Sequence, residues 1–149
     1  MGRFVKPASI RLPLSEGDHI DVKQRLNHGE REDMFARMAP HAIQLDRREV
    51  RTAKVVAYLL GWSLTDGDAP GQGHPVPMSP DLPEPVRIDT IRSLDPDTFV
   101  EIHDAIEAHE AAVTAARADA KKKTAGTPAS DPISPSPSAA AGPSMTSEP

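Results

Sequence analysis

Residues 50–66 read Val-Arg-Thr-Ala-Lys-Val-Val-Ala-Tyr-Leu-Leu-Gly-Trp-Ser-Leu-Thr-Asp, and this stretch contains the only Trp and the only Tyr of the chain. At helical spacing its apolar side chains fall on one broad stripe: Val50, Ala53, Val56, Ala57, Leu59 and Leu60. Asp46 and Glu49, just before the stripe, have the spacing of a capping box. The pattern predicts a central helix over residues 47–62, whose apolar face the remaining segments must cover.

Near the N-terminus, two runs of alternating apolar and polar residues flank the turn sequence Ser-Glu-Gly-Asp at 15–18. Such runs around a glycine-containing turn predict a β-hairpin, here over residues 9–25, after a lead-in of residues 1–7. Pro13 cannot donate a ladder hydrogen bond, so its strand is expected at the edge of a sheet or to end there.

A helix over residues 28–39 is predicted from a second capping box, formed by Asn27 and Glu30. Its apolar stripe consists of Met34, Phe35 and Met38. Pro40 is expected to end this helix, because proline lacks the backbone N–H that a helix interior needs.

The last predicted helix covers residues 96–118 and has the clearest start. Asp95 is the expected N-cap and Pro96 the first helical residue, while Leu94 and Phe99 have the spacing of a hydrophobic staple. A short helical turn over 86–94 is possible from its apolar spacing. The apolar stripe of the last helix thins after Ile106, so its second half is expected to face solvent or a partner.

Two segments are predicted to lack regular structure. Residues 67–86 are too rich in Pro and Gly for a helix or strand, which predicts a long loop. Residues 119–149 are rich in Ala, Ser and Pro and hold too little apolar surface to fold, which predicts a disordered tail. The expected fold class is therefore α+β, mostly α: a small domain over 8–118, with the N-terminal hairpin packed on about three helices.

Composition limits the possible functions. The formal net charge is −5 and no basic block stands out, which argues against nucleic-acid binding. No apolar run is long enough to cross a membrane, and no Cys is present to form a disulfide or a thiolate metal site. We expect a soluble intracellular protein.

Six histidines are candidate metal ligands or acid–base groups. His103, Glu107 and His109 lie on the predicted last helix, where about 100° per residue places His103 and Glu107 on one face and His109 well round from them. The motif His-Glu-x-x-His is absent, so these are expected to be solvated helix-surface residues. We predict no metal site, no cofactor and no catalytic residues, and hence a protein that is not an enzyme.

Several motifs together resemble the tail assembly chaperones of long-tailed bacteriophages and prophages, over about residues 4–115. The motifs, in chain order, are Phe-Val-Lys-Pro (4–7), Ser-Glu-Gly-Asp (15–18), Tyr-Leu-Leu-Gly-Trp-Ser-Leu-Thr-Asp (58–66), Leu-Asp-Pro-Asp-Thr-Phe (94–99) and Ile-Glu-Ala-His-Glu (106–110), followed by a Ser/Pro-rich tail. The insertion at 69–85 is longer than this family's pattern leads us to expect.

The resemblance implies a non-enzymatic binder that shields the tape-measure protein in the cytoplasm of the bacterial host. It also implies the tail-tube protein as a second candidate partner, and a longer product made by ribosomal frameshifting. The residues expected to bind a partner are Trp62, Tyr58, Met34, Phe35 and Met38. Each of these has an alternative interpretation as a core residue, and for Trp62 the core role is favoured.

Two other functions stay open at this point. The chain is alternatively a structural component of the tail, retained in the mature virion, or a general helical protein-interaction module.

Overall fold

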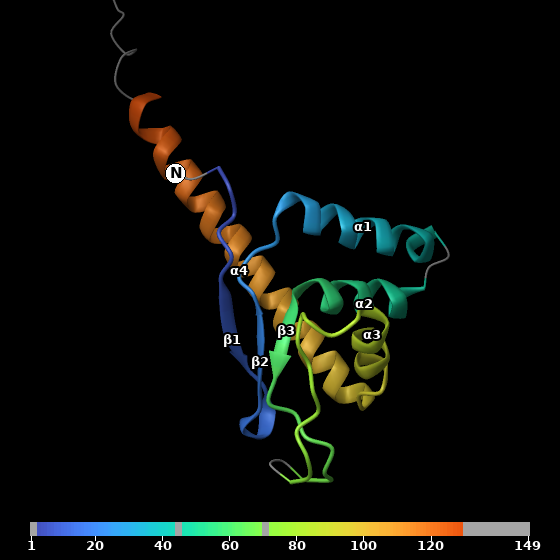
Figure 1. Cartoon of the computed structure of the whole chain (residues 1–149). Coiled ribbons are helices and arrows are strands. Elements are labelled where there is room, and N and C mark those ends of the chain that lie inside the picture. Colours follow the sequence, from blue (N-terminus) through green and yellow to red (C-terminus); the bar gives the residue numbers. More distant parts are fainter. Residues whose placement is uncertain (1–2, 44–45, 70–71, 130–149) are drawn as a thin grey trace, which may run out of the picture. The chain divides into compact units, whose positions relative to one another are not determined.

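The computed structural model describes residues 3–43, 46–69 and 72–129, with side chains described for 3–40, 46–69 and 72–124. The chain divides into two compact units, residues 1–110 and 111–149, so the first unit ends inside the predicted domain 8–118. The fold class is α+β and mostly α, as predicted (Figure 1).

An antiparallel sheet of three strands in the order β1-β2-β3 forms the β part of the first unit. The predicted hairpin is confirmed: β1 covers Ser9–Pro13, β2 covers His19–Lys23, and a 3-10 turn at Ser15–Gly17 joins them. The turn needs left-handed backbone, with φ of 60° at Glu16 and 82° at Gly17. Pro13 ends the edge strand, where its missing N–H costs no central ladder bond.

The prediction of a helix over 47–62 is wrong in its last turn. Helix α2 covers Arg47–Tyr58, and Leu59–Trp62 form the third strand, β3. Leu59 pairs with Val22 and is fully buried, so pairing with the hairpin completes the sheet and buries this side chain. Gly61 is a poor helix former, which favours an end of α2 before this position.

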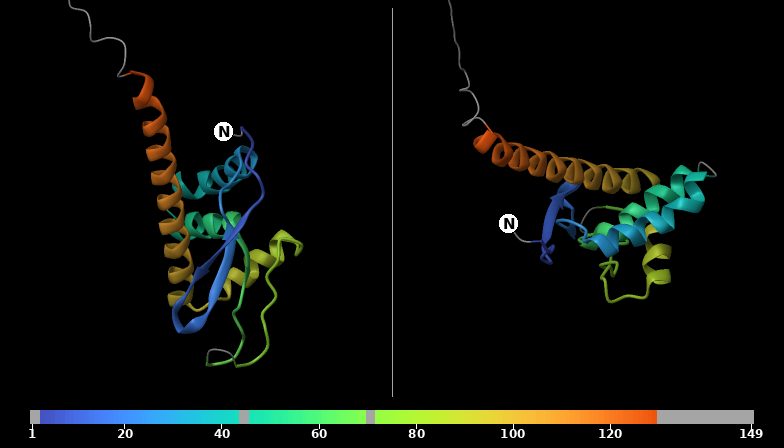
Figure 2. Two further views of the ribbon diagram at one scale, coloured as in Figure 1. Left: turned by 90° about the vertical axis from the view of Figure 1, so that its left-hand side faces the viewer. Right: turned by 90° about the horizontal axis from the view of Figure 1, so that it is seen from above.

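Helix α1 covers His28–Ile43, so Pro40 does not end the helix as predicted. Pro40 and Ala36 are both exposed, so solvent can satisfy the carbonyl that loses its helical hydrogen bond. The predicted capping box is confirmed: Glu30 N donates to Asn27 Oδ1 at 2.8 Å, and Asn27 N donates to Glu30 Oε2 at 2.9 Å. Helices α1 and α2 lie side by side (Figures 1 and 2).

Helix α3 covers Glu84–Arg92 and helix α4 covers Pro96–Ala129. Helix α3 begins inside the predicted loop 67–86, and Pro75 of that loop forms an isolated bridge with Thr65, which precedes the loop. The N-cap of α4 is confirmed, since Asp95 Oδ2 accepts hydrogen bonds from the backbone N–H groups of residues 97 and 98.

Part of the predicted disordered tail is helical. Helix α4 continues beyond the predicted end at 118 to Ala129, and residues 119–125 are mostly alanine and lysine, which are strong helix formers. The rest of the predicted tail, 130–149, lies outside the described residues.

The core lies where the first half of α4 runs along the hairpin. Both ends of this contact carry hydrogen bonds: Ser15 N donates to Glu101 Oε2, and His109 Nε2 lies 2.9 Å from the carbonyl oxygen of Gln24. The fully or almost fully buried side chains between them come from β2, α2, β3, α3 and α4: Ile20, Val22, Val55, Leu59, Ile91, Ile102 and Ile106.

Candidate functional site

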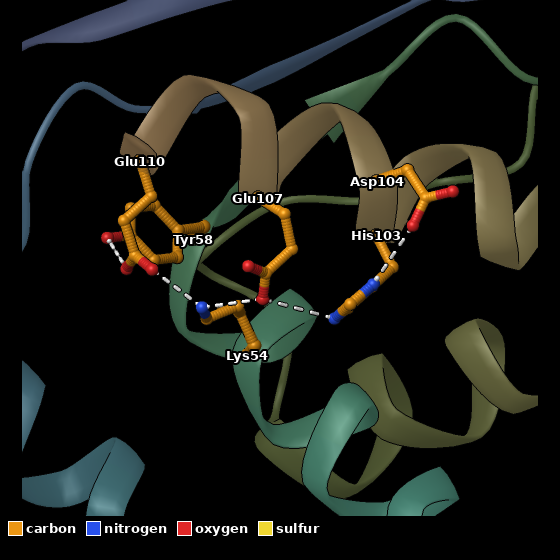
Figure 3. Close-up of polar contacts among 6 residues, drawn as sticks. All are labelled: Lys54, Tyr58, His103, Asp104, Glu107 and Glu110. Atoms are coloured by element: carbon orange, nitrogen blue, oxygen red, sulfur yellow. Dashed lines mark hydrogen bonds and ion pairs between the residues drawn. The ribbon is translucent and has the colours of Figure 1, made fainter. Parts of the chain in front are cut away.

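A cluster of charged side chains fills the contact between α2 and the first half of α4 (Figure 3). Lys54 Nζ on α2 donates to Glu107 Oε1 at 2.7 Å and to Glu110 Oε1 at 2.6 Å. The hydroxyl of Tyr58 donates to the other carboxylate oxygen of Glu110, also at 2.6 Å. His103 Nε2 lies 3.5 Å from Glu107 Oε1. We call these five residues the α2–α4 seam.

The helical repeat explains why these residues meet. Lys54 and Tyr58 are one turn apart on α2, and Glu107 and Glu110 are nearly one turn apart on α4, so each pair shares a face of its helix. Tyr58 is buried and only 13% of the Lys54 side chain is exposed, so the contacts lie partly out of water. Ion pairs of this kind are stronger than fully exposed ones.

The seam shifts the pKa values of its ionisable groups. Burial alone would raise the pKa of Glu110, but the hydrogen bonds from Lys54 and Tyr58 outweigh it, and the pKa is lowered. Burial alone would lower the pKa of Lys54, but the hydrogen bonds to both glutamates raise it. Burial, and then the hydrogen bond to Glu110, raise the pKa of Tyr58 well above its ordinary value. Each shift favours the protonation states that make the hydrogen bonds.

The chemistry of the seam is therefore that of a closed polar contact. The lysine donates to both carboxylates, and the phenol is held protonated as a hydrogen-bond donor to one of them. A phenol held protonated is a poor general base. The arrangement fixes α2 against α4.

The histidines differ from their predicted role as solvated surface residues. His103 and Glu107 share a face as predicted, but only 13% of the His103 side chain is exposed, and its ring stacks on Phe99 with 6.4 Å between ring centroids. His109 is 9% exposed and contacts the carbonyl of Gln24 at the end of β2. The hairpin side therefore covers His109, whereas His103 lies on the face of α4 that meets α2 (Figure 3). Within the described ranges, no group of three or more His, Cys, Asp or Glu side chains could hold a metal ion.

The structure separates the predicted partner-binding residues into three groups. Met34 and Tyr58 are buried core residues, with 4% and 5% of their surface exposed. Trp62 is half-buried in β3, where its indole N–H donates to the carbonyl of Val76 at 2.8 Å and holds the long loop against the sheet. Phe35 is 48% exposed and presents apolar surface on α1, whereas Met38 is half-buried and packs against the core.

The sequence interpretation missed the seam and the role of Arg87. Arg87 lies on α3, and its Nη2 donates to the carbonyls of Val56 and Leu59 at 3.0 and 3.2 Å, which satisfies oxygens at the C-terminal end of α2. One sequence signal could have indicated the seam: Lys54 and Tyr58 are polar groups one helical turn apart in an otherwise apolar segment.

No family model, no curated protein and no solved structure matches this chain. In the part of the chain that the structure describes, every helix is too short or too polar to cross a lipid bilayer.

Proposed function

We propose that this chain is a non-enzymatic binding protein that acts as a tail assembly chaperone of a long-tailed bacteriophage or prophage. In this role it binds the tape-measure protein in the host cytoplasm and shields its apolar helices until the tail tube forms around them. The motif resemblance over residues 4–115 suggests the role, and the exposed apolar surface of α1 supports it.

The observation that carries the proposal is the exposure of Phe35. A large aromatic side chain with 48% of its surface exposed leaves apolar area that a partner helix can cover. Aromatic residues are frequent energetic centres of protein interfaces. Met38 lies three residues further along α1 and is half-buried, and its flexible side chain can adapt to different apolar partners.

The surroundings of Phe35 also suit a helical partner. The guanidinium carbon of Arg31 lies 5.8 Å from the centre of the Phe35 ring, so an apolar surface stands beside a positive charge. Arg31 is exposed and lies one turn before Phe35 on the same helix. An amphipathic helix that packs beside α1 can place apolar residues on the ring and a carboxylate on the arginine.

Binding of the purified tape-measure protein, or of its soluble helical fragments, tests the proposal. We expect Phe35→Ala to weaken binding by about tenfold or more, as for a hot-spot aromatic residue. Val86→Ala is the matched control, because Val86 is 46% exposed and lies on α3. Both variants should keep the wild-type circular dichroism spectrum. Equal affinity of the wild type and both variants would show that Phe35 does not contribute to the binding site. Absence of binding by the wild type would reject the tape-measure protein as the partner.

A further inference from the structure

A second surface lies at the other end of the α2–α4 contact, where the start of α2, the end of α3 and the start of α4 meet. It is a groove of about 460 Å³ with an apolar floor and a basic rim. The floor includes Ile91, Leu94 and Phe99, and the rim includes Arg48, Arg51 and Arg92. Val100 also lines the groove and is 42% exposed.

Two of the rim arginines have free charges. Arg92 pairs with Glu49 at 2.8 Å. Arg48 and Arg51 are exposed, and within the described ranges neither guanidinium makes an ion pair or hydrogen bond. The positive rim also contrasts with the formal net charge of −5 for the whole chain.

The placement of these arginines does not help α2 itself. Arg48 lies in the first turn of α2, near the positive end of the helix dipole, where acidic residues are favoured and basic residues are not, and Arg51 follows in the second turn. An arginine there that pairs with no carboxylate of the chain adds little to stability. Its charge is available to a partner.

We infer that this groove docks an acidic amphipathic helix of a partner protein. A large apolar side chain of that helix enters the groove beside Phe99 and Val100, and flanking carboxylates pair with Arg48 and Arg51. Charge complementarity selects this occupant: an apolar floor disfavours a purely polar ligand, and the two unpaired arginines of the rim disfavour a basic helix. The inference concerns the chemistry of the partner and stands independently of the proposal about tail assembly.

A pair of labelled helical peptides tests the inference on the full-length chain. Both carry Leu and Phe at the spacing of one helix face, and the flanking positions are Glu in the first peptide and Lys in the second. Fluorescence anisotropy should show that the glutamate peptide binds the wild type at least about tenfold more tightly than the lysine peptide, and that its affinity falls as salt is raised.

Charge reversal at the rim should reverse this preference. In the double variant Arg48→Glu/Arg51→Glu we expect the glutamate peptide to lose at least about tenfold in affinity and the lysine peptide to gain. The control is Arg3→Glu/Arg25→Glu, which changes the net charge equally at two other exposed arginines and should bind as the wild type does. Val100→Gln should weaken binding without any change of charge.

Amide chemical-shift changes on adding the glutamate peptide should concentrate in residues 48–52 and 91–100. The inference is overturned if neither peptide binds, if both bind the wild type equally, if both double variants lose affinity equally, or if the shift changes lie elsewhere.

Discussion

The hydroxyl of Tyr58 donates to Glu110 at 2.6 Å, joining positions that are 52 residues apart in the chain. Lys54, one turn earlier on α2, binds the other oxygen of the same carboxylate. The contact joins α2, the central helix, to α4, the last helix. Tyr58 is the only tyrosine of the chain, and the sequence predicted it as a partner-binding residue. In the structure it is a buried residue that holds α2 against α4.

Tyr58→Phe should destabilise the domain by about 1–2 kcal/mol, at the low end of the values for a hydrogen bond to a charged group because Glu110 is partly exposed. The ring and its packing stay, and Glu110 keeps its contact with Lys54, so the loss reports the hydroxyl alone. Urea denaturation measures the change. An unchanged slope of the free energy of unfolding against urea concentration would show that the mutation leaves the unfolded state the same. A stability equal to that of the wild type would show that the hydrogen bond contributes nothing.

Tyr58 should titrate above the ordinary tyrosine pKa of 10.0, because burial and the neighbouring Glu110 both disfavour the phenolate. Since it is the only tyrosine, the ultraviolet absorbance of tyrosinate reports this residue without interference. The folded chain should show less tyrosinate than the chain in denaturant at the same alkaline pH. Glu110→Gln should bring the folded-state pKa closer to 10.0. Coincident titration curves for the folded and denatured chains would contradict the burial of the phenol.

Stability should fall in acid partly through Glu110. Its folded-state pKa lies below the ordinary value of 4.5, so its contribution is present above pH 4.5 and is lost as the pH falls through the lowered pKa. Glu110→Gln removes this titration, so the variant should lose less stability than the wild type between neutral pH and about pH 3. Thermal unfolding over that range gives the comparison. Parallel pH profiles for the two proteins would assign the acid sensitivity to other carboxylates.

Arg87→Met should destabilise the domain by about 1–3 kcal/mol, because it removes the donor that satisfies two carbonyls at the end of α2. Methionine keeps much of the apolar side chain, so packing changes little. Arg92→Met is the matched control on the same helix. It removes a partly exposed ion pair with Glu49, so the free energy of unfolding should fall by less than about 1 kcal/mol. Similar losses for both variants would mean that the capping role of Arg87 is unimportant.

Features set by neighbours in sequence could be predicted. The capping box of Asn27 and Glu30, the N-cap at Asp95 and the hairpin around Gly17 each depend on residues within a few positions of one another. Their hydrogen bonds follow from local geometry, so the sequence pattern is sufficient.

Features set by distant pairing could not be predicted. Leu59, Leu60 and Trp62 fit the helical stripe that precedes them as well as they fit a strand, and only pairing with β2 decides between the two. The seam likewise depends on how α4 lies against α2, which no local pattern specifies. The same distant packing buried Met34 and Tyr58, so the sequence could name the large side chains but not which of them face outward.

Co-expression with the tape-measure protein of the same genome tests the central claim most directly. The fraction of that protein found in the soluble lysate should rise strongly when this chain is present and should fall back with Phe35→Ala, while Val86→Ala should behave as the wild type. Solubility of the tape-measure protein that is the same with and without this chain would contradict the chaperone role.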